Sequence, residues 1–568
     1  RYQLKPRGAS FSAERIDLVV GDENFRPVDI VAAADGAVYF TDWVDKSYNL
    51  HKKGRIWRLS TAAEPSPLGR GQGEGDALLK VPPHPGPLPG GEGDRTAIAH
   101  FKTVAEQRAD ALRNTYAPLD SKEAAALWTA CDDSDPFIQQ AAREGLKSIA
   151  AVSSEINLKS LNPLRRLAAE RILREENSSA AQTRLPDFLS DPDPDIRLIA
   201  LIWAGEEHIT AVRHDLDKAI SAGPTTAKLF AAYLAAQEKL DRPPRKDADE
   251  WASDQYCAAA LLAESTPPEP RRWALRTLRP DHPSITSDRM KTWLASDDQK
   301  LRLEAIRTLR DSQLADRQTL LWQIADDLTG PTLFRCEAMV GVQPDSADST
   351  ERLIALAGGN DLSLATESLR SLRGAPIAAS QREQLASLKS KSAAVADLVN
   401  KVLAPQADAN LPQPSELDRW LTLLEGPADA AAGERVFFHS KSASCSRCHQ
   451  VGGRGAQVGP DLTVPGRTLE RRRLVESILS PSKEIAPQFV VWSLLLTDGR
   501  SLTGMLLGIN ADDSERYADP TGKVFSLKPA VIESRKPLAN SLMPENLQRQ
   551  MTVQEFRDLL AFLQHGGE

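Results

Sequence analysis

The 568-residue sequence has little cysteine and little methionine, with five of each. It has no apolar run near the roughly 18 to 20 residues that a membrane-spanning helix needs, so we expect no transmembrane segment. Its 70 Lys and Arg are outnumbered by 78 Asp and Glu, for a net charge of -8. We therefore expect no nucleic-acid partner, because phosphate binding favours a basic surface. The length exceeds what one core supports, so we expect about two to four domains.

Two of the few cysteines lie in the stretch Cys445-Ser-Arg-Cys448-His449. Cysteines at this spacing, followed at once by histidine, can all face one side of a short helical turn. Both sulfurs can then bond one flat ligand while the imidazole lies beneath its centre. This is the attachment geometry of a c-type haem, so the sequence predicts a covalently bound haem c with its iron.

Two other readings of the cysteine pair stay open. It could be half of a structural zinc site, which needs a second pair of ligands, or a redox dithiol, which is typical of a βαβ setting. The remaining cysteines, Cys131, Cys257 and Cys336, are scattered singly. The spacing and its context favour the haem reading over both.

Covalent haem attachment is normally completed outside the bacterial cytoplasm, so we expect a periplasmic or otherwise extracytoplasmic protein. The first residues, Arg1-Tyr-Gln-Leu-Lys-Pro-Arg7, contain neither an apolar core nor a small-residue cleavage site of an export signal. We therefore expect the sequence to be a mature or truncated form, or one whose start lies upstream.

Residues 16–59, within an expected first domain of residues 1–60, are typical of β-structure, with Asp35-Gly36 as a hairpin turn. The expected strands are 16–20, 28–32, 38–43 and 54–59. The segment resembles the last blade of glucose/sorbosone dehydrogenase-like β-propellers. The resemblance rests on Arg26-Pro-Val-Asp-Ile30, Asp35-Gly-Ala-Val-Tyr39, Thr41-Asp-Trp43 and Gly54-Arg-Ile-Trp-Arg58. It covers about one blade where propellers have roughly four to eight, so we interpret it as a remnant.

Residues 61–96 are rich in Gly and Pro and contain a degenerate tandem repeat, which predicts a disordered insertion. Residues 97–425 show short amphipathic helices that follow Asp-Pro or Ser-Asp turns, such as 190–197 and 296–302. Helices that cannot bury their apolar faces alone stack into a solenoid. The stretch resembles HEAT-type repeats, and an irregular helical domain is the alternative. Either reading implies a scaffold or docking surface.

The last segment, 426–568, follows the order of a cytochrome c with a small sheet inserted at about 487–535. In that sheet we expect a hairpin around Asp498-Gly499 and further strands at 524–527 and 530–533. A first helix near Gly433 precedes the cysteine motif, and a helix lies around 469–479. Thr552 and Glu555 form a capping box that begins a closing helix, which we expect to cross the first one near Gly433 and Phe437. The expected fold class is therefore mainly α and multidomain, with a β-blade fragment, a HEAT-like solenoid and a cytochrome c fold.

Few residues can supply the sixth iron ligand. Three methionines follow the motif: Met505 lies in a strand pattern, Met551 precedes a helix cap, and Met543 lies on a loop stiffened by Pro544. A thioether opposite imidazole raises the reduction potential of the iron, which suits Met543. His565 and a core-filling role for Met543 are the alternatives.

The motifs of this segment resemble the PVC-type (planctomycete and verrucomicrobial) haem-binding c-type cytochrome domain. They are Cys445-Ser-Arg-Cys-His449, Gly459-Pro-Asp-Leu462, Ile478-Leu-Ser-Pro-Ser482, Asp498-Gly499 with Gly504, and Ser541-Leu-Met-Pro-Glu545. The resemblance implies Cys445 and Cys448 as thioether anchors, with His449 and Met543 as the iron ligands. It also implies that the Pro460 carbonyl accepts the proton on the second nitrogen of His449.

The sequence thus predicts an electron carrier that passes single electrons from a donor dehydrogenase to a respiratory acceptor. One alternative is a haem-linked sugar or alcohol dehydrogenase, which would need propeller blades that this chain lacks. A second alternative is a binding scaffold in which the haem is only structural.

Overall fold

The protein is described by a computed structural model. Its described residues are 2–7, 10–15, 26–32, 38–42, 54–59, 104–115, 121–147, 158, 161–241, 254–404, 411–464, 468–510 and 512–565. They are mainly helical with a few small sheets, which confirms the predicted class at that level. The chain divides into two compact units, 1–150 and 151–568. The predicted insertion 61–96 lies outside the described residues, and the predicted domain boundaries stay predictions.

In its described residues, the first unit contains two small antiparallel sheets and three helices. The hairpin of β1 (Tyr2–Arg7) and β2 (Ser10–Arg15) was not predicted, and the expected strand at 16–20 lies outside the described residues. The other three expected strands form one sheet in the order β3-β4-β5. Their bounds, and those of the helices, are β3 (Pro27–Ala32), β4 (Val38–Asp42), β5 (Arg55–Leu59), α1 (Val104–Arg113), α2 (Ser121–Ala130) and α3 (Pro136–Lys147).

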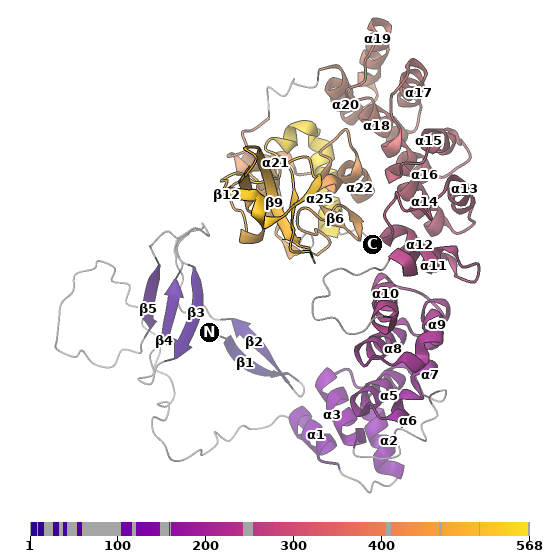
Figure 1. Cartoon of the computed structure of the whole chain (residues 1–568), viewed down its shortest axis with the longest axis vertical. Coiled ribbons are helices and arrows are strands. Elements are labelled where there is room, and N and C mark those ends of the chain that lie inside the picture. The colour runs from indigo at the N-terminus through magenta and orange to yellow at the C-terminus, as the bar shows by residue number, and fades with distance from the viewer. Residues whose placement is uncertain are drawn as a thin grey trace, which may run out of the picture. The chain divides into compact units, whose positions relative to one another are not determined.

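The second unit begins with a long series of helices, shown in Figure 1. They are α5 (Pro163–Glu176), α6 (Ser179–Gln182), α7 (Leu185–Leu189), α8 (Pro194–Glu206), η2 (Thr210–Asp215), α9 (Leu216–Ser221), α10 (Ala227–Asp241), α11 (Asp254–Leu262), α12 (Pro268–Thr277), α13 (Ser287–Leu294), α14 (Gln299–Asp311), α15 (Arg317–Asp326), α16 (Thr332–Gly341), α17 (Ala347–Gly358), α18 (Leu362–Ser371), α19 (Ala379–Ser387), η3 (Leu388–Ser390) and α20 (Ala393–Leu403).

Aspartates begin several of these helices, as the sequence predicts. The Asp193 carboxylate accepts from the Asp195 N–H at 2.9 Å at the start of α8. Asp298 and Asp361 do the same for α14 and α18, at 2.8 and 3.1 Å from the backbone nitrogens of Leu301 and Leu364. Each bond satisfies one of the N–H groups that a helix leaves unpaired at its N-terminus.

The helices from α12 to α20 pack in an alternating pattern. Each of α12, α14, α16 and α18 contacts the next even-numbered helix, so these helices and α20 form a continuous row. The helices α13 and α17 pack against α14 and α18 of that row, whereas α15 packs against both α14 and α16. Between them lie buried apolar side chains such as Ile306, Leu309 and Met339. This arrangement gives every amphipathic helix a partner for its apolar face.

The C-terminal module of the second unit, residues 411–565, carries the cysteine motif. Its helices are α21 (Leu417–Leu423), α22 (Ala430–Phe438), η4 (Cys445–Arg447), α24 (Arg471–Leu479), η5 (Pro487–Phe489), η6 (Pro529–Val531), η7 (Leu547–Gln550) and α25 (Val553–His565). The capping box is present, since Thr552 N–H and Glu555 N–H each donate to the other residue's side chain, at 2.7 and 3.2 Å. The ring centroids of Phe437 on α22 and Phe562 on α25 are 5.7 Å apart, so the predicted crossing is confirmed.

An antiparallel sheet lies between α24 and α25 in the sequence, with strand order β11-β10-β9-β8-β12. The strands are β8 (Val491–Leu496), β9 (Ser501–Ile509), β10 (Glu515–Ala518), β11 (Val524–Leu527) and β12 (Ile532–Pro537). The predicted hairpin around Asp498-Gly499 is confirmed, with Gly499 at a φ of 84°. Strand β10 was not predicted. The strand expected at 530–533 begins only at Ile532, because Pro529 opens a 3-10 turn before it.

Candidate functional site

The cysteine motif lies on a tight turn that begins after α22. Ser444 has a left-handed backbone with a φ of 52°, and η4 follows directly. The backbone N–H groups of Cys448 and His449 both donate to the Cys445 carbonyl, at 3.1 and 2.9 Å. The motif is therefore one short helical turn, which is the local conformation that its spacing predicts.

The His449 side chain is held by the segment that follows it. Its Nδ1 lies 2.9 Å from the Pro460 carbonyl oxygen. A carbonyl can only accept, so Nδ1 carries the proton and Nε2 keeps its lone pair. Burial lowers the pKa of His449 against the opposing effect of this bond, so the ring is neutral at pH 7. A neutral imidazole with a free Nε2 is the form that binds a metal.

Gly459 lies directly against the imidazole. A methyl group on Gly459 would come within 2.6 Å of the His449 Cε1 atom and 2.8 Å of its Nδ1. The ring can therefore keep this position only while residue 459 has no side chain. The backbone of the same segment is tied to the motif, since Gly459 N–H donates to the Cys448 carbonyl at 2.7 Å and Ala456 N–H donates to the Ser446 carbonyl at 2.9 Å.

The five cysteines fall into two groups, and none of them forms a disulfide. Cys131, Cys257 and Cys336 are buried, whereas Cys445 and Cys448 are partly exposed. Burial raises the pKa of Cys445 to about 12 and also raises that of Cys448, so both thiols are protonated at neutral pH. Among the described residues, no three His, Cys, Asp or Glu side chains are placed to hold one metal ion, and that includes the two motif cysteines with His449.

Two apolar clusters bring the motif and the Met543 loop to the same part of the module. The first cluster is centred on α22, α24 and α25, and both Cys445 and Met543 pack against it. The second cluster consists of Val458, Met505 and Ala518, and both Cys448 and Leu542 pack against it. The half-buried Cys445, Cys448 and Met543 therefore border apolar surfaces on two sides, which suits a flat apolar macrocycle.

The loop that carries Met543 is anchored to the end of α24. Met543 N–H donates to Ser541 Oγ at 3.1 Å, and Ser541 N–H donates to Ser482 Oγ at 3.2 Å. Ser482 Oγ in turn donates to Glu545 at 2.7 Å. The Met543 side chain is half-buried, while Met505 and Met551 are buried inside the two clusters. At the other candidate ligand, His565, Nδ1 bonds to the Ala561 carbonyl of its own helix at 2.7 Å.

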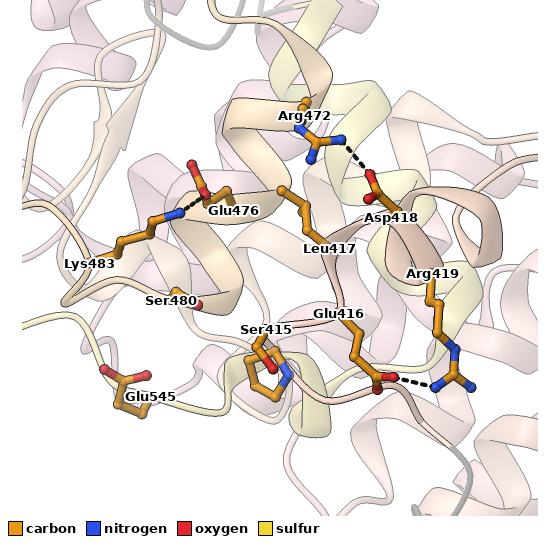
Figure 2. Close-up of a pocket in the computed structure, with 11 residues that line it drawn as sticks. Ser415, Glu416, Leu417, Asp418, Arg419, Arg472, Glu476, Ser480, Lys483 and Glu545 are labelled. Atoms are coloured by element: carbon orange, nitrogen blue, oxygen red, sulfur yellow. Dashed lines mark hydrogen bonds and ion pairs between the residues drawn. The ribbon is translucent and has the colours of Figure 1, made fainter. Parts of the chain in front are cut away.

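An open cleft of about 750 Å³ adjoins this loop through Glu545. Figure 2 shows that most of its charged side chains are paired with one another, whereas Glu545 stands apart from these pairs. Arg472 lies 2.6 Å from Asp418, Arg419 lies 2.5 Å from Glu416, and Lys483 contacts Glu476. The wall of the cleft therefore carries charges of both signs that largely neutralise each other.

Comparison with models of protein families finds no match. No curated protein matches the chain either. In the part of the chain that the structure describes, no helix is both long enough and apolar enough to span a bilayer.

The structure also shows residues of the site that the sequence did not indicate. Arg454, only five positions after His449, is buried and bonds to Glu304 on α14. Nothing in the local sequence signals this contact, since the partners are 150 positions apart. Ser482 belongs to the motif Ile478-Leu-Ser-Pro-Ser482, but the sequence does not indicate that its side chain anchors the Met543 loop.

The Asp42 side chain belongs to the three-stranded sheet of the first unit. It is buried at the end of β4, where its carboxylate accepts from Arg26 N–H at 2.7 Å and from Trp57 Nε1 at 3.0 Å. Two such donors hold the carboxylate in place, which gives it a structural role in the three-stranded sheet.

Proposed function

We propose that residues 426–568 form a cytochrome c domain that binds one haem c covalently and transfers electrons. Cys445 and Cys448 would anchor it through thioether bonds, with His449 and Met543 as its axial ligands. A bound haem c supplies reversible one-electron exchange at its iron. No substrate chemistry is assigned to this chain.

The observation that carries the proposal is the state of His449. Its Nδ1–H donates to the Pro460 carbonyl, which orients the ring and leaves Nε2 available on the motif that carries both cysteines. A carbonyl that accepts from the ring nitrogen facing away from the metal fixes the tautomer of a metal-binding histidine and raises its basicity. A redox dithiol on the same cysteines gives no role to this arrangement, and a structural zinc site would need further ligands besides these cysteines and His449.

The Met543 loop adds a second line of support. Met543 borders the same apolar cluster as Cys445. The loop is fixed by Ser482, so the thioether is held near one position. A thioether ligand favours ferrous iron over ferric iron, which suits a carrier in a respiratory chain.

We further propose that the helices before this domain form a HEAT-like solenoid that serves as its scaffold. The alternating contacts of α12, α14, α16, α18 and α20 support this fold. The partners would be redox proteins, a donor dehydrogenase and a respiratory acceptor. The protein would act outside the cytoplasm, where covalent haem attachment is normally completed.

Mass spectrometry of the chain expressed with a haem-maturation system tests the function. We expect the mass to rise by one haem, and we expect the rise to disappear in Cys445→Ala/Cys448→Ala. Cys257→Ala, which removes a lone buried thiol outside the motif, is the matched control and should keep the haem. An unchanged mass in the wild-type chain would refute the proposal.

Reduced absorption spectra test the ligands. We expect a sharp α-band that the wild-type ferrous protein keeps under carbon monoxide, because both axial positions are filled. Met543→Ala should bind carbon monoxide, whereas Met551→Leu, a volume-conserving change in the core, should not. Carbon monoxide binding by the folded wild-type protein would exclude Met543 as the sixth ligand.

A further inference from the structure

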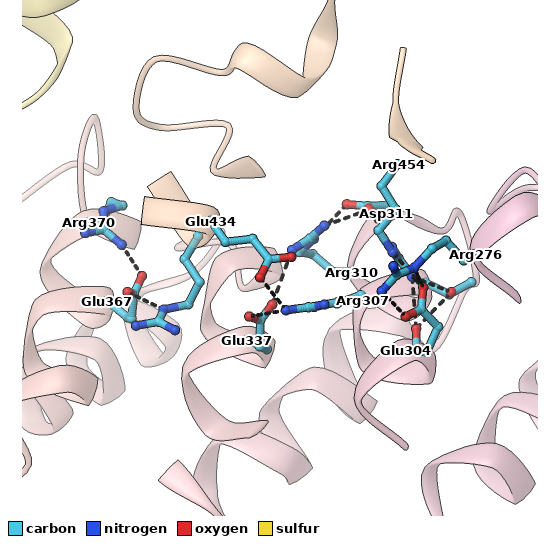
Figure 3. A network of polar contacts seen from close by, with 12 residues as sticks. Arg276, Glu304, Arg307, Arg310, Asp311, Glu337, Glu367, Arg370, Glu434 and Arg454 are labelled. Atoms are coloured by element: carbon cyan, nitrogen blue, oxygen red, sulfur yellow. Dashed lines mark hydrogen bonds and ion pairs between the residues drawn. The ribbon is translucent and has the colours of Figure 1, made fainter. Parts of the chain in front are cut away.

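A buried network of arginines and acidic residues joins the helical row to the C-terminal module, as Figure 3 shows. On the helical side are Arg276, Glu304, Arg307, Arg310, Asp311, Glu337, Glu367, Arg370 and Arg373. The module contributes Glu434, Arg435, Arg454 and Glu555. Buried charges are rare in proteins unless they are paired, so each of these contacts fixes the geometry of its partner.

Glu304 is the member of the network that reaches toward the cysteine motif. Its carboxylate accepts from Arg276 Nε and Nη2 at 3.0 and 2.9 Å, and from Arg454 Nε and Nη2 at 2.8 and 2.5 Å. Burial by itself would raise the pKa of Glu304, but the guanidinium groups of Arg454 and Arg276 outweigh it and lower the pKa to about 2. Glu304 is therefore ionised and holds two guanidinium groups at once.

The guanidinium group of Arg454 donates several hydrogen bonds to residues of α14. Besides the Glu304 carboxylate, its Nη2 donates to the Glu304 carbonyl and to Thr308 Oγ1, both at 3.2 Å. Burial lowers the pKa of Arg454 below its ordinary value, yet the ionised Glu304 beside it keeps the guanidinium charged at neutral pH. A guanidinium with several fixed acceptors has one orientation, so it defines the position of its own backbone.

The backbone of Arg454 belongs to a short hairpin whose two strands have two residues each, β6 (Gln450–Val451) and β7 (Arg454–Gly455). The hairpin begins immediately after His449. The strands meet so closely that a methyl group on Gly455 would lie 2.2 Å from the His449 carbonyl oxygen. On the other side, Leu462 N–H donates to the Gln450 carbonyl at 2.8 Å. The hairpin thus connects Arg454, His449 and the segment of Pro460.

We propose that Glu304 is a positioning residue for the candidate haem site: through Arg454 it fixes the hairpin that begins at His449. Helix α14, which carries Glu304, then helps to position the residues of the site. The inference rests on the proposed function for its consequence at the iron, whereas the link between Glu304 and the hairpin stands on the contacts alone.

The matched control lies in the same interface. Glu367 on α18 is as buried as Glu304, and it also bonds an arginine of the module, Arg435, at 2.7 Å. Arg435 lies on α22 and not on the hairpin. Glu304→Gln and Glu367→Gln therefore remove equivalent buried carboxylates, and only the first should release the residues around His449.

Hydrogen exchange in the full chain without haem tests the link. We expect Glu304→Gln to speed amide exchange at Gly459 and Leu462 by on the order of ten-fold, because the hairpin opens locally. Glu367→Gln should leave these two amides at the wild-type rate. Equal rates in wild type and Glu304→Gln, or equal acceleration in both variants, would overturn the proposal.

Electron paramagnetic resonance of the ferric haem-loaded chain tests the consequence at the iron. The g anisotropy of a low-spin haem reports the orientation of its axial ligands, which lost stability alone does not change. We expect a shifted or split spectrum in Glu304→Gln and a wild-type spectrum in Glu367→Gln. A wild-type spectrum in Glu304→Gln refutes the positioning role, whereas a wild-type chain that takes up no haem refutes the proposed function and leaves the exchange result standing.

Arg454→Lys keeps the inference testable if Glu304→Gln does not fold. Lysine keeps the buried charge pair but has a single nitrogen, so it cannot reproduce the two Arg454 nitrogens that donate to Glu304 Oε1. In Arg454→Lys we expect faster amide exchange at Gly459 and Leu462 and a changed electron paramagnetic resonance spectrum. Both effects should be smaller than in Glu304→Gln. A folded Arg454→Lys with wild-type exchange at Gly459 and Leu462 would overturn the proposal.

Discussion

Gly433 on α22 lies directly against the backbone of Asp558 on α25. A methyl group on Gly433 would come within 1.9 Å of the Asp558 carbonyl oxygen and 2.4 Å of its carbonyl carbon. Only a residue without a side chain allows this distance between the two helices. Asp558 also accepts from the Asp429 N–H at 2.8 Å, just before α22 begins. The pair therefore sets the approach of the two helices that enclose the first apolar cluster.

Gly433→Ala should destabilise the C-terminal module by about 1–3 kcal/mol, because backbone atoms must move to make room for the methyl group. Urea unfolding followed by circular dichroism measures the change. Gly358→Ala is the control, since a methyl group there would meet no described atom within 4 Å. It should leave stability unchanged or raise it by about 0.5–1 kcal/mol. Equal stability of the two variants would contradict the close contact.

Gly459→Ala should displace the imidazole of His449, whose Cε1 lies 2.6 Å from the position of the new methyl group. In wild type we expect nitrogen NMR to show one neutral tautomer with the proton on Nδ1, because that atom donates to Pro460. The variant should show a mixture of tautomers. Gly508→Ala, on β9 with no described atom within 4 Å of its methyl group, should keep the wild-type signal. A wild-type tautomer in Gly459→Ala would contradict the contact.

The lowered pKa of Glu555 predicts that the folded protein loses stability in acid. Burial would raise its pKa, but Arg373 and Arg370 outweigh burial and lower it to about 2 from an ordinary value of 4.5. The folded state then binds fewer protons than the unfolded state between these values, so the stabilisation is complete above pH 4.5 and lost as the pH falls toward 2. The loss should be about 3 kcal/mol.

Unfolding midpoints of wild type and Glu555→Gln across this pH range measure the effect. The variant should be less stable than wild type near neutral pH by about 3–5 kcal/mol, since the two buried arginines lose their shared partner. The difference should narrow as the pH falls toward 2. A constant difference at every pH would show that Glu555 does not titrate with folding.

The raised pKa of Glu170 predicts the opposite pH dependence of protein stability. Its side chain is fully buried on α5, and neither carboxylate oxygen has a hydrogen-bond partner among the described residues. Burial, reinforced by the charge of Asp191, raises its pKa well above the ordinary value of 4.5. The group therefore favours folding while it is protonated, and its contribution is lost as the pH rises through the raised value.

Glu170→Gln should match wild type in acid, because glutamine resembles the protonated carboxyl group. Above neutral pH the variant should be the more stable protein, since it has no charge to bury. Thermal unfolding at several pH values measures this. Glu206→Gln, a half-exposed control on α8, should not gain stability with pH. A variant that is less stable than wild type at every pH would show that Glu170 is ionised and paired.

The sequence predicted those features of the fold that depend on local pattern. Asp193 and Asp298 begin their helices as expected, and Thr552 with Glu555 forms the expected capping box. Strand β10 escaped prediction because its inward-facing Glu515 reads as a surface residue. In the structure Glu515 is buried, where Tyr517 OH donates to it at 2.6 Å and Arg535 donates at 3.1 Å. The Arg535 donor comes from another strand, β12, so this part of the compensation leaves no local pattern.

The candidate site shows the same limit. The spacing of Cys445, Cys448 and His449 identified one turn, and the turn is there. The contact of Glu304 with Arg454 could not be predicted, because charged residues are assigned to the surface unless a partner is known. Single residues far apart in the sequence carry no periodicity that would connect them.

The burial of three of the five cysteines gives the chain an internal standard for thiol counting. A thiol reagent added to the folded, unloaded protein should label only the two motif cysteines, while the denatured protein should show five. Thioether formation would consume the partly exposed pair and leave the three buried thiols as a constant background. The stoichiometry of covalent attachment could then be read from one colorimetric titration, without a spectrum of the cofactor.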